Sequence, residues 1–186
     1  MRKLKLQMHI SIDGFVASTN SEPLNSKWDD GLRTFSIDIL KNVDCILHGR
    51  KTAEGFIPYW SKIANNPKDP ENKLGKLFTN IPKIVFSNTL KTNKWDNTTI
   101  LSGDITEEIK ALKEQKGRDI IIYGGYSFVS SLIQQGLIDE FNLLVNPVAL
   151  GSGEPIFKQT TDLELEKSIP FACGVNILIY KSSRKQ

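Results

Sequence analysis

Residues 119–128 read DIIIYGGYSF, and this stretch decides the fold. Three consecutive isoleucines are typical of a short strand that is covered on both faces, as in a parallel sheet between two layers of helices. The glycine pair at 124–125 breaks the strand, and apolar residues at helical spacing follow it. Gly136 is expected to end this helix as a C-cap, with Leu137 as its apolar contact. The stretch therefore predicts a buried strand, a tight turn and a helix.

Strands and helices alternate on both sides of this unit. Helices are expected to begin near residues 30, 53, 105 and 126, the one at 53 with only one or two turns. The expected strands cover 4–12, 45–47, 83–87, 99–102, 119–123, 140–146, 163–167 and 175–181. Such alternation predicts an α/β fold, a three-layer sandwich with a mixed but mostly parallel sheet and helices on both faces. The closing run of strands predicts antiparallel additions at one edge.

Two segments have no clear periodicity. Residues 17–27 are rich in Ser and Asn and predict a long loop, which is a candidate lid. Residues 58–82 contain four prolines with many Asn and Lys residues, and they predict an irregular excursion without a core of its own. We therefore interpret residues 1–186 as a single domain.

The composition excludes several functional classes. The net charge is +3 and basic side chains are scattered along the chain, which disfavours nucleic acid as a partner. Gln7, His9 and Asp13 interrupt the apolar run that a signal peptide needs, and no stretch is long enough to span a membrane. We expect a cytoplasmic protein without membrane association. Cys45 and Cys173 are expected to be reduced thiols.

Three ends of predicted strands carry residues suited to a ligand. At 123–128 the paired glycines allow close backbone approach, and the helix that follows presents free N–H groups to a pyrophosphate. At 49–52 a similar junction adds two cations and a hydroxyl, which suits a phosphate monoester. Ser87 and Asn88 follow a third strand. The alternatives are a tight turn at 123–128, solvated surface cations at 49–52 and an ordinary turn at 87–88.

Five motifs, in this order, resemble the dihydrofolate-reductase-like superfamily, in particular the RibD-type reductase domain of riboflavin biosynthesis. They are Ser11-Ile12-Asp13-Gly14-Phe15-Val16-Ala17, Gly49-Arg50-Lys51-Thr52, Val85-Phe86-Ser87-Asn88, Ile122-Tyr123-Gly124-Gly125, and 146–157 with Asn146-Pro147 and Gly151-Ser152-Gly153. The resemblance extends from Leu6 to Tyr180.

The resemblance implies NADPH as the cofactor. It implies that Val16 and Ala17 lie near the nicotinamide, and that the segments at 49–52 and 87–88 lie near the adenosine phosphate. The segment at 124–128 would lie near the pyrophosphate. The residues implied to bind the cofactor are Val16, Ala17, Gly49, Arg50, Lys51, Thr52, Ser87, Asn88, Gly124, Gly125, Tyr126, Ser127 and Phe128.

The transfer of a hydride is expected to be accompanied by the transfer of a proton, which needs a donor. True dihydrofolate reductases carry a carboxylate at the start of the first helix, and Asp29 or Asp30 occupies that place as a candidate catalytic residue. The same residue is equally explained as a helix N-cap. Those enzymes also use an arginine in the region matching 58–82, where this chain has none, and this disfavours folate. His9 and His48 are expected on strands, so neither a metal site nor a histidine triad is predicted.

These observations predict an NADPH-dependent oxidoreductase. It would transfer a hydride to a C=N or C=O bond of a small heterocyclic or ribosylaminopyrimidine-like substrate, as a 5-amino-6-(5-phosphoribosylamino)uracil reductase does. The alternatives are an authentic dihydrofolate reductase and a non-catalytic NADP-binding protein. A homodimer is also expected, because strands 140–146 and 175–181 alternate apolar side chains near an edge that would otherwise be unprotected.

Overall fold

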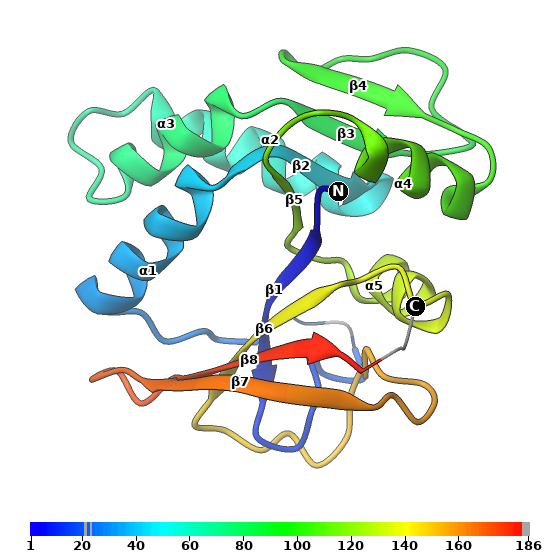
Figure 1. Cartoon of the computed structure of the whole chain (residues 1–186). Coiled ribbons are helices and arrows are strands. Elements are labelled where there is room, and N and C mark those ends of the chain that lie inside the picture. The colour runs from blue at the N-terminus through cyan, green and yellow to red at the C-terminus, as the bar shows by residue number, and fades with distance from the viewer. Residues whose placement is uncertain (21, 23, 184–186) are drawn as a thin grey trace.

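The computed structural model describes residues 1–20, 22 and 24–183, so positions 21 and 23 of the predicted loop lie outside the described residues. The strands of this part form one sheet in the order β4-β3-β2-β5-β1-β6-β8-β7 (Figure 1). Their bounds are β1 (Leu4–Ser11), β2 (Val43–Gly49), β3 (Lys83–Phe86), β4 (Thr98–Leu101), β5 (Asp119–Ile122), β6 (Glu140–Asn146), β7 (Leu163–Pro170) and β8 (Asn176–Ser182).

The sheet has a parallel body and an antiparallel edge. The β1 strand pairs in parallel with β5 and with β6, and β2 pairs in parallel with β5 and β3. The β8 strand is antiparallel to both β6 and β7. This arrangement confirms the predicted mixed sheet with antiparallel additions at one edge. The β6 and β8 strands, however, each have a neighbour on both sides, so neither 140–146 nor 175–181 forms the unprotected edge that was predicted; β7 is the edge strand at this end of the sheet, and β4 is the edge strand at the other.

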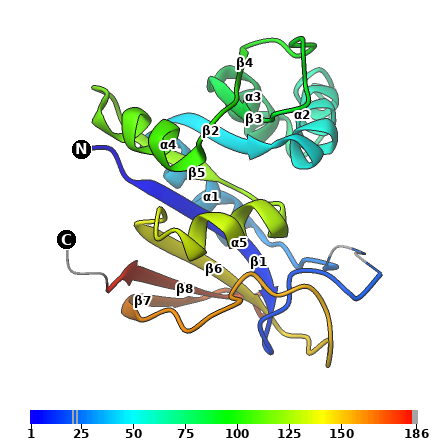
Figure 2. The ribbon, with the colours of Figure 1, turned by 90° about the vertical axis from the view of Figure 1, so that its right-hand side faces the viewer.

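Helices cover both faces, as predicted for a three-layer sandwich (Figures 1 and 2). Ile120 and Ile122 of β5 share one core with α4 and α5, whereas Ile121 faces the opposite core with α1 and α3. Alternate side chains of the isoleucine run thus fill two layers. The helices are α1 (Asp30–Lys41), α2 (Arg50–Ala64), α3 (Asn72–Asn80), α4 (Ile105–Glu114) and α5 (Tyr126–Gln134).

The end of α5 confirms the sequence interpretation of Gly136. This glycine has a φ of +66°, and its N–H donates to the Ile133 carbonyl at 2.9 Å. The Leu137 N–H donates to the Leu132 carbonyl at 3.0 Å. These two bonds make a Schellman motif, which satisfies carbonyl groups that the helix itself leaves free.

The prediction for residues 58–82 was wrong. The α2 helix runs through Pro58 to Ala64, and α3 follows it. Proline costs a helix one backbone hydrogen bond, but Pro58 lies on the exposed side of α2, and the helix buries Ile57 and Ile63, which are both 7% exposed. A Cβ on Gly75 of α3 would lie 2.8 Å from Ile63, so the two helices pack with almost no gap. This segment builds part of the core.

No helix in the described part of the chain is both long and apolar enough to cross a membrane. Within residues 1–20, 22 and 24–183, no three His, Cys, Asp or Glu side chains come close enough together to hold a metal ion. Cys45 and Cys173 are free, as predicted.

Candidate functional site

The carboxyl ends of β2 and β5 lead directly into the N-termini of α2 and α5. Between these helix ends lies a crevice of about 280 Å³, called here the helix-end crevice. It is lined by Gly49, Arg50, Lys51, Thr52, Phe86, Gly125, Tyr126, Ser127 and Phe128. In α/β sheets, ligands bind at this end of the strands. Two of the predicted cofactor segments, 49–52 and 125–128, therefore meet although they are far apart in sequence.

Glycines stand where the two helix ends approach each other closely. A Cβ on Gly49 would lie 3.1 Å from the Phe128 ring, and a Cβ on Gly125 would lie 2.9 Å from the Thr52 hydroxyl. Both glycines are N-caps without a side-chain hydrogen bond to the helix. The first N–H groups of α2 and α5 thus lack a cap, and two helix dipoles direct positive charge toward the same crevice. This geometry suits a phosphate or pyrophosphate.

The cations of the crevice are accessible. The Arg50 guanidinium is 38% exposed and pairs with Glu54 one turn along α2 at 3.1 Å. Lys51 is exposed on the same turn. An exposed ion pair of this kind contributes little to stability, so Arg50 can exchange Glu54 for a phosphate at small cost.

Five predicted cofactor residues do not line the crevice, namely Val16, Ala17, Ser87, Asn88 and Gly124. The Ser87 hydroxyl accepts hydrogen bonds from the N–H groups of Thr89 and Leu90, and the Asn88 side chain accepts one from Gly103. These contacts fit the alternative of an ordinary turn. Val16 and Ala17 are 7% and 5% exposed and bond to the backbone of residue 154. A Cβ on Gly153 would lie 2.2 Å from the Ala17 carbonyl oxygen. The first and last family motifs therefore hold each other in place.

A second cavity, of about 170 Å³, lies beside the crevice and is called here the aromatic cavity. It is lined by Gln7, Met8, His9, Trp28, Ser36, Phe56, Trp60, Leu74, Phe78 and Tyr123. Tyr123 lines this cavity and Gly125 lines the crevice, so the β5–α5 turn separates the two. The rings pack closely: Trp60 and Phe78 are 4.4 Å apart, and Phe56 stacks on Tyr123 at 5.7 Å. The sequence analysis missed this cavity, because its lining comes from six separate segments.

Burial keeps the ionisable groups around the aromatic cavity neutral. Desolvation lowers the pKa of His9 to about 4, against the opposing effect of its contact with Asn146. Desolvation, with the Lys83 charge, lowers the pKa of His48 to about 3. The pKa of Tyr123 is raised by burial. At neutral pH all three side chains are uncharged.

Asp29 is the N-cap of α1, as one of the two interpretations predicted. Its carboxylate accepts the N–H of Leu32 and, across the molecule, the N–H of Cys173, both at 2.8 Å. These bonds hold the pKa of Asp29 below its usual value. A proton donor needs a raised pKa. The Asp30 side chain is 100% exposed and pairs with Arg33, and neither carboxylate lines the aromatic cavity. The geometry thus favours the capping role over catalysis.

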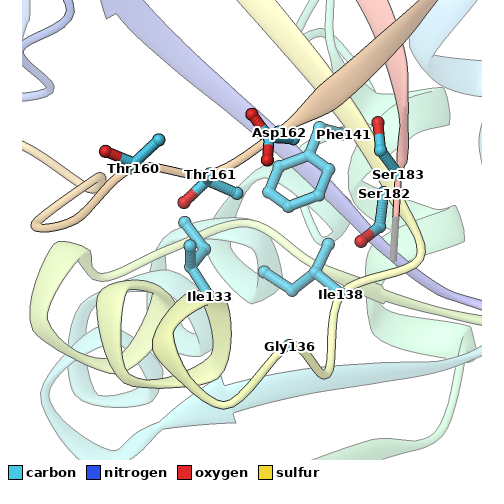
Figure 3. Close-up of a pocket in the computed structure, with 9 residues that line it drawn as sticks. All are labelled: Ile133, Gly136, Ile138, Phe141, Thr160, Thr161, Asp162, Ser182 and Ser183. Carbon is cyan, nitrogen blue, oxygen red and sulfur yellow. The ribbon is translucent and has the colours of Figure 1, made fainter. Parts of the chain in front are cut away.

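Another pocket, of about 240 Å³, lies beside the start of β6 (Figure 3). Its rim carries hydroxyl groups and one carboxylate, and its floor is apolar (Figure 3). It is lined by Ile133, Gly136, Ile138, Phe141, Thr160, Thr161, Asp162, Ser182 and Ser183. None of these described residues is a cation, so the pocket does not suit a phosphate.

The chain is similar to two proteins of Bacillus subtilis (strain 168). The protein YyaP is 37% identical over 183 residues, which is 96% of this chain and 94% of that protein. The protein YwjB is 28% identical over 163 residues, which is 87% of this chain and 86% of that protein.

Solved structures share the fold at lower identity. A putative riboflavin biosynthesis protein from Shewanella sp. PV-4 matches with a TM-score of 0.70 and 21% identity, covering 99% of this chain and all of that one. A diaminohydroxyphosphoribosylaminopyrimidine deaminase/5-amino-6-(5-phosphoribosylamino)uracil reductase from Thermotoga maritima matches with a TM-score of 0.68 and 16% identity. The match covers 97% of this chain but only 56% of the Thermotoga chain. The family model of the RibD C-terminal domain matches residues 2–177, and the chain therefore belongs to the RibD C-terminal domain family.

Proposed function

We propose that the chain is an NADPH-dependent reductase that transfers a hydride to a C=N or C=O bond of a small heterocyclic substrate. One observation carries the proposal: two glycine-capped helix N-termini face one crevice, and a cavity lined by aromatic side chains lies beside it. The first feature suits a dinucleotide phosphate, and the second suits a ring that must meet the nicotinamide away from water. Family membership supports a reductase.

Each part of the site has a separate task in this proposal. Gly125 and the N–H groups of α5 would hold the pyrophosphate, and Arg50 and Lys51 would hold the adenosine phosphate. NADPH held in this way would supply the hydride. The apolar lining of the aromatic cavity would orient the substrate ring. Because Asp29 and Asp30 lie outside that cavity, we propose that the accompanying proton comes from water.

Comparing the affinities for NADPH and NADH tests directly where the adenosine phosphate binds. We expect Arg50→Ala with Lys51→Ala to lower NADPH affinity by roughly tenfold to a hundredfold and to leave NADH affinity nearly unchanged, since only the extra phosphate needs these cations. Titration of the cofactor's own fluorescence measures both affinities. Lys62→Ala, which removes a cation from the last turn of α2, is the matched control. Equal loss of both affinities would place the phosphate elsewhere.

We also propose that the molecule forms a homodimer through β7. Among the strands of the described residues, this edge strand pairs with β8 alone, and Leu165 in it is 53% exposed. An open edge with an exposed apolar side chain is a common site of association. Sedimentation equilibrium is expected to give a mass twice that of the 20.9 kDa chain. Leu165→Lys is expected to lower the measured mass toward that of the monomer. Ile12→Lys, at a site 65% exposed directly after β1, is the control. A wild-type monomer at micromolar concentration would contradict this proposal.

A further inference from the structure

A further cavity, of about 290 Å³, takes no part in the proposed function and is called here the lysine cavity. Its lining comes from α2, the end of α3, the start of β3 and the segment before β4, in the upper part of Figure 1. It is lined by Ile57, Pro58, Ser61, Thr79, Lys83, Lys94, Trp95 and Asp96. None of these residues lines the helix-end crevice or the aromatic cavity.

Lys83 is a buried cation without a counter-charge. The residue is only 3% exposed, and its Nζ donates to the backbone carbonyls of Thr79 and Ile81 at 2.9 and 2.8 Å. These carbonyls end α3, where the helix dipole favours a cation. An ammonium group has three N–H donors, however, so one remains. No carboxylate of the described residues lies within the 4.0 Å of an ion pair with Lys83.

This remaining N–H indicates an acceptor that the chain itself does not supply. Buried lysine is rare unless it is paired, and buried donors are almost always satisfied. Because Lys83 and Thr79 both line the cavity, a ligand there can approach the ammonium group. A negatively charged acceptor would also offset the cost of burying this cation.

The rest of the lining defines the charge and the shape of such a ligand. The Lys94 Nζ lies over the Trp95 ring at 5.1 Å, which holds a second cation beside the cavity. With Asp96 as the one carboxylate among the described lining residues, two positive charges and one negative charge give a net charge of +1. Ile57 and Trp95 supply apolar surface. The volume is roughly twice that of a cavity that holds benzene, which leaves room for a ring with a short chain.

We propose that the lysine cavity binds a small organic monoanion, whose carboxylate accepts the third N–H of Lys83 and whose flat apolar body lies against Trp95. Lys94 stabilises the same negative charge. A phosphate dianion is disfavoured, because the cavity would keep a partly buried negative charge that no cation balances. Binding of this ligand needs neither NADPH nor the substrate of the proposed reductase.

Isothermal titration calorimetry of the whole chain with three probes of similar size tests this proposal. The probes are 3-phenylpropanoate, its neutral amide 3-phenylpropanamide, and L-phenylalanine, which adds an ammonium group to the propanoate. We expect the propanoate to bind at least tenfold more tightly than either other probe, since the amide lacks the charge and the amino acid brings a further cation. Equal binding of propanoate and amide, tighter binding of phenylalanine, or no binding of any probe at millimolar concentration would overturn the proposal.

Side-chain variants locate the bound probe. Lys83→Met is expected to lower propanoate affinity at least tenfold, but it also removes two hydrogen bonds to the end of α3. Lys94→Ala, at an exposed position, keeps the test independent of folding and is expected to lower the affinity roughly threefold to tenfold. Lys91→Ala is the matched control, since Lys91 is exposed on the same segment and does not line the cavity. Unchanged affinity in either Lys83→Met or Lys94→Ala would contradict the assignment.

The pH dependence of binding gives a separate readout. Desolvation lowers the pKa of Lys83 to about 8. The titratable groups around it are Cys45 and His48 of β2, with Lys94 and Asp96 of the cavity. The pKa of Cys45 is raised to about 12 and that of His48 is lowered to about 3, so neither changes its charge between pH 7 and pH 9.

Only the ammonium form of Lys83 attracts a carboxylate, so propanoate affinity is expected to fall as the pH rises through this pKa. The expected fall is about tenfold between pH 7 and pH 9. Lys83→Met retains Lys94 and Asp96 and should bind weakly at both values, with little change between them. The same fall in wild type and in Lys83→Met would show that another group holds the anion.

Discussion

Gly125→Val is expected to abolish measurable NADPH binding, with a loss of affinity of roughly a hundredfold or more. The first atom of any side chain at this position lies 2.9 Å from the Thr52 hydroxyl, so Thr52 must move and the added methyl groups enter the crevice. They would occupy the place where the pyrophosphate approaches the N-terminus of α5. Cofactor fluorescence titration measures the loss.

Gly55→Val is the matched control for this substitution. Gly55 lies in α2, and a Cβ added there would have no atom within 4 Å, so the new side chain enters open space. Circular dichroism should show a native fold for both variants, and only the valine at 125 should affect the cofactor. NADPH affinity within about threefold of wild type in a folded Gly125→Val protein would mean that the pyrophosphate lies elsewhere.

Acid is expected to destabilise the protein steeply below about pH 6.5. His48 is 0% exposed, its two ring nitrogens have no hydrogen-bond partner, and its pKa is lowered to about 3. His9 has a pKa of about 4. Between the unfolded value of 6.5 and these folded values the unfolded chain binds more protons, so stability falls with falling pH. The slope is about 1.4 kcal/mol per pH unit for each histidine.

Urea unfolding at a series of pH values from 7 to 4 measures this slope. His48→Leu removes one titrating group and two unpartnered nitrogens, and it is expected to halve the histidine contribution to the slope without loss of stability at pH 7. His48 packs 4.6 Å from the Phe56 ring, so an apolar replacement keeps that contact. A slope unchanged by His48→Leu would show that this residue is already charged, or hydrated, in the folded protein.

Local patterns in the sequence predicted much of the fold. The isoleucine run, the glycine pair and the end of α5 at Gly136 were interpreted correctly, because each depends on residues within a few positions of each other. The α2 helix was underestimated, because Pro58 was interpreted as a break. Its apolar residues continue at helical spacing past the proline, and tertiary packing outweighs the lost hydrogen bond.

The site was predictable only in part. The helix-end crevice follows from two strand-to-helix junctions, each visible in sequence, and the parallel sheet places them together. The aromatic cavity combines Gln7, Trp28, Trp60 and Tyr123 from distant segments, and no local spacing indicates that they meet. The choice between the two roles of Asp29 depends in part on its hydrogen bond with the Cys173 N–H, which only the tertiary structure reveals.

The place of β1 in the sheet has a consequence for biosynthesis. Leu4 pairs with Ile120 on one side, and Lys5 pairs with Glu140 on the other, so β1 is made more than a hundred residues before either of its neighbours. At roughly 5 to 20 residues per second, about 6 to 26 s separate the synthesis of Ser11 from that of Glu140. During that time the apolar side chains of β1 lack their sheet partners, and exposed strands of this kind are prone to aggregate.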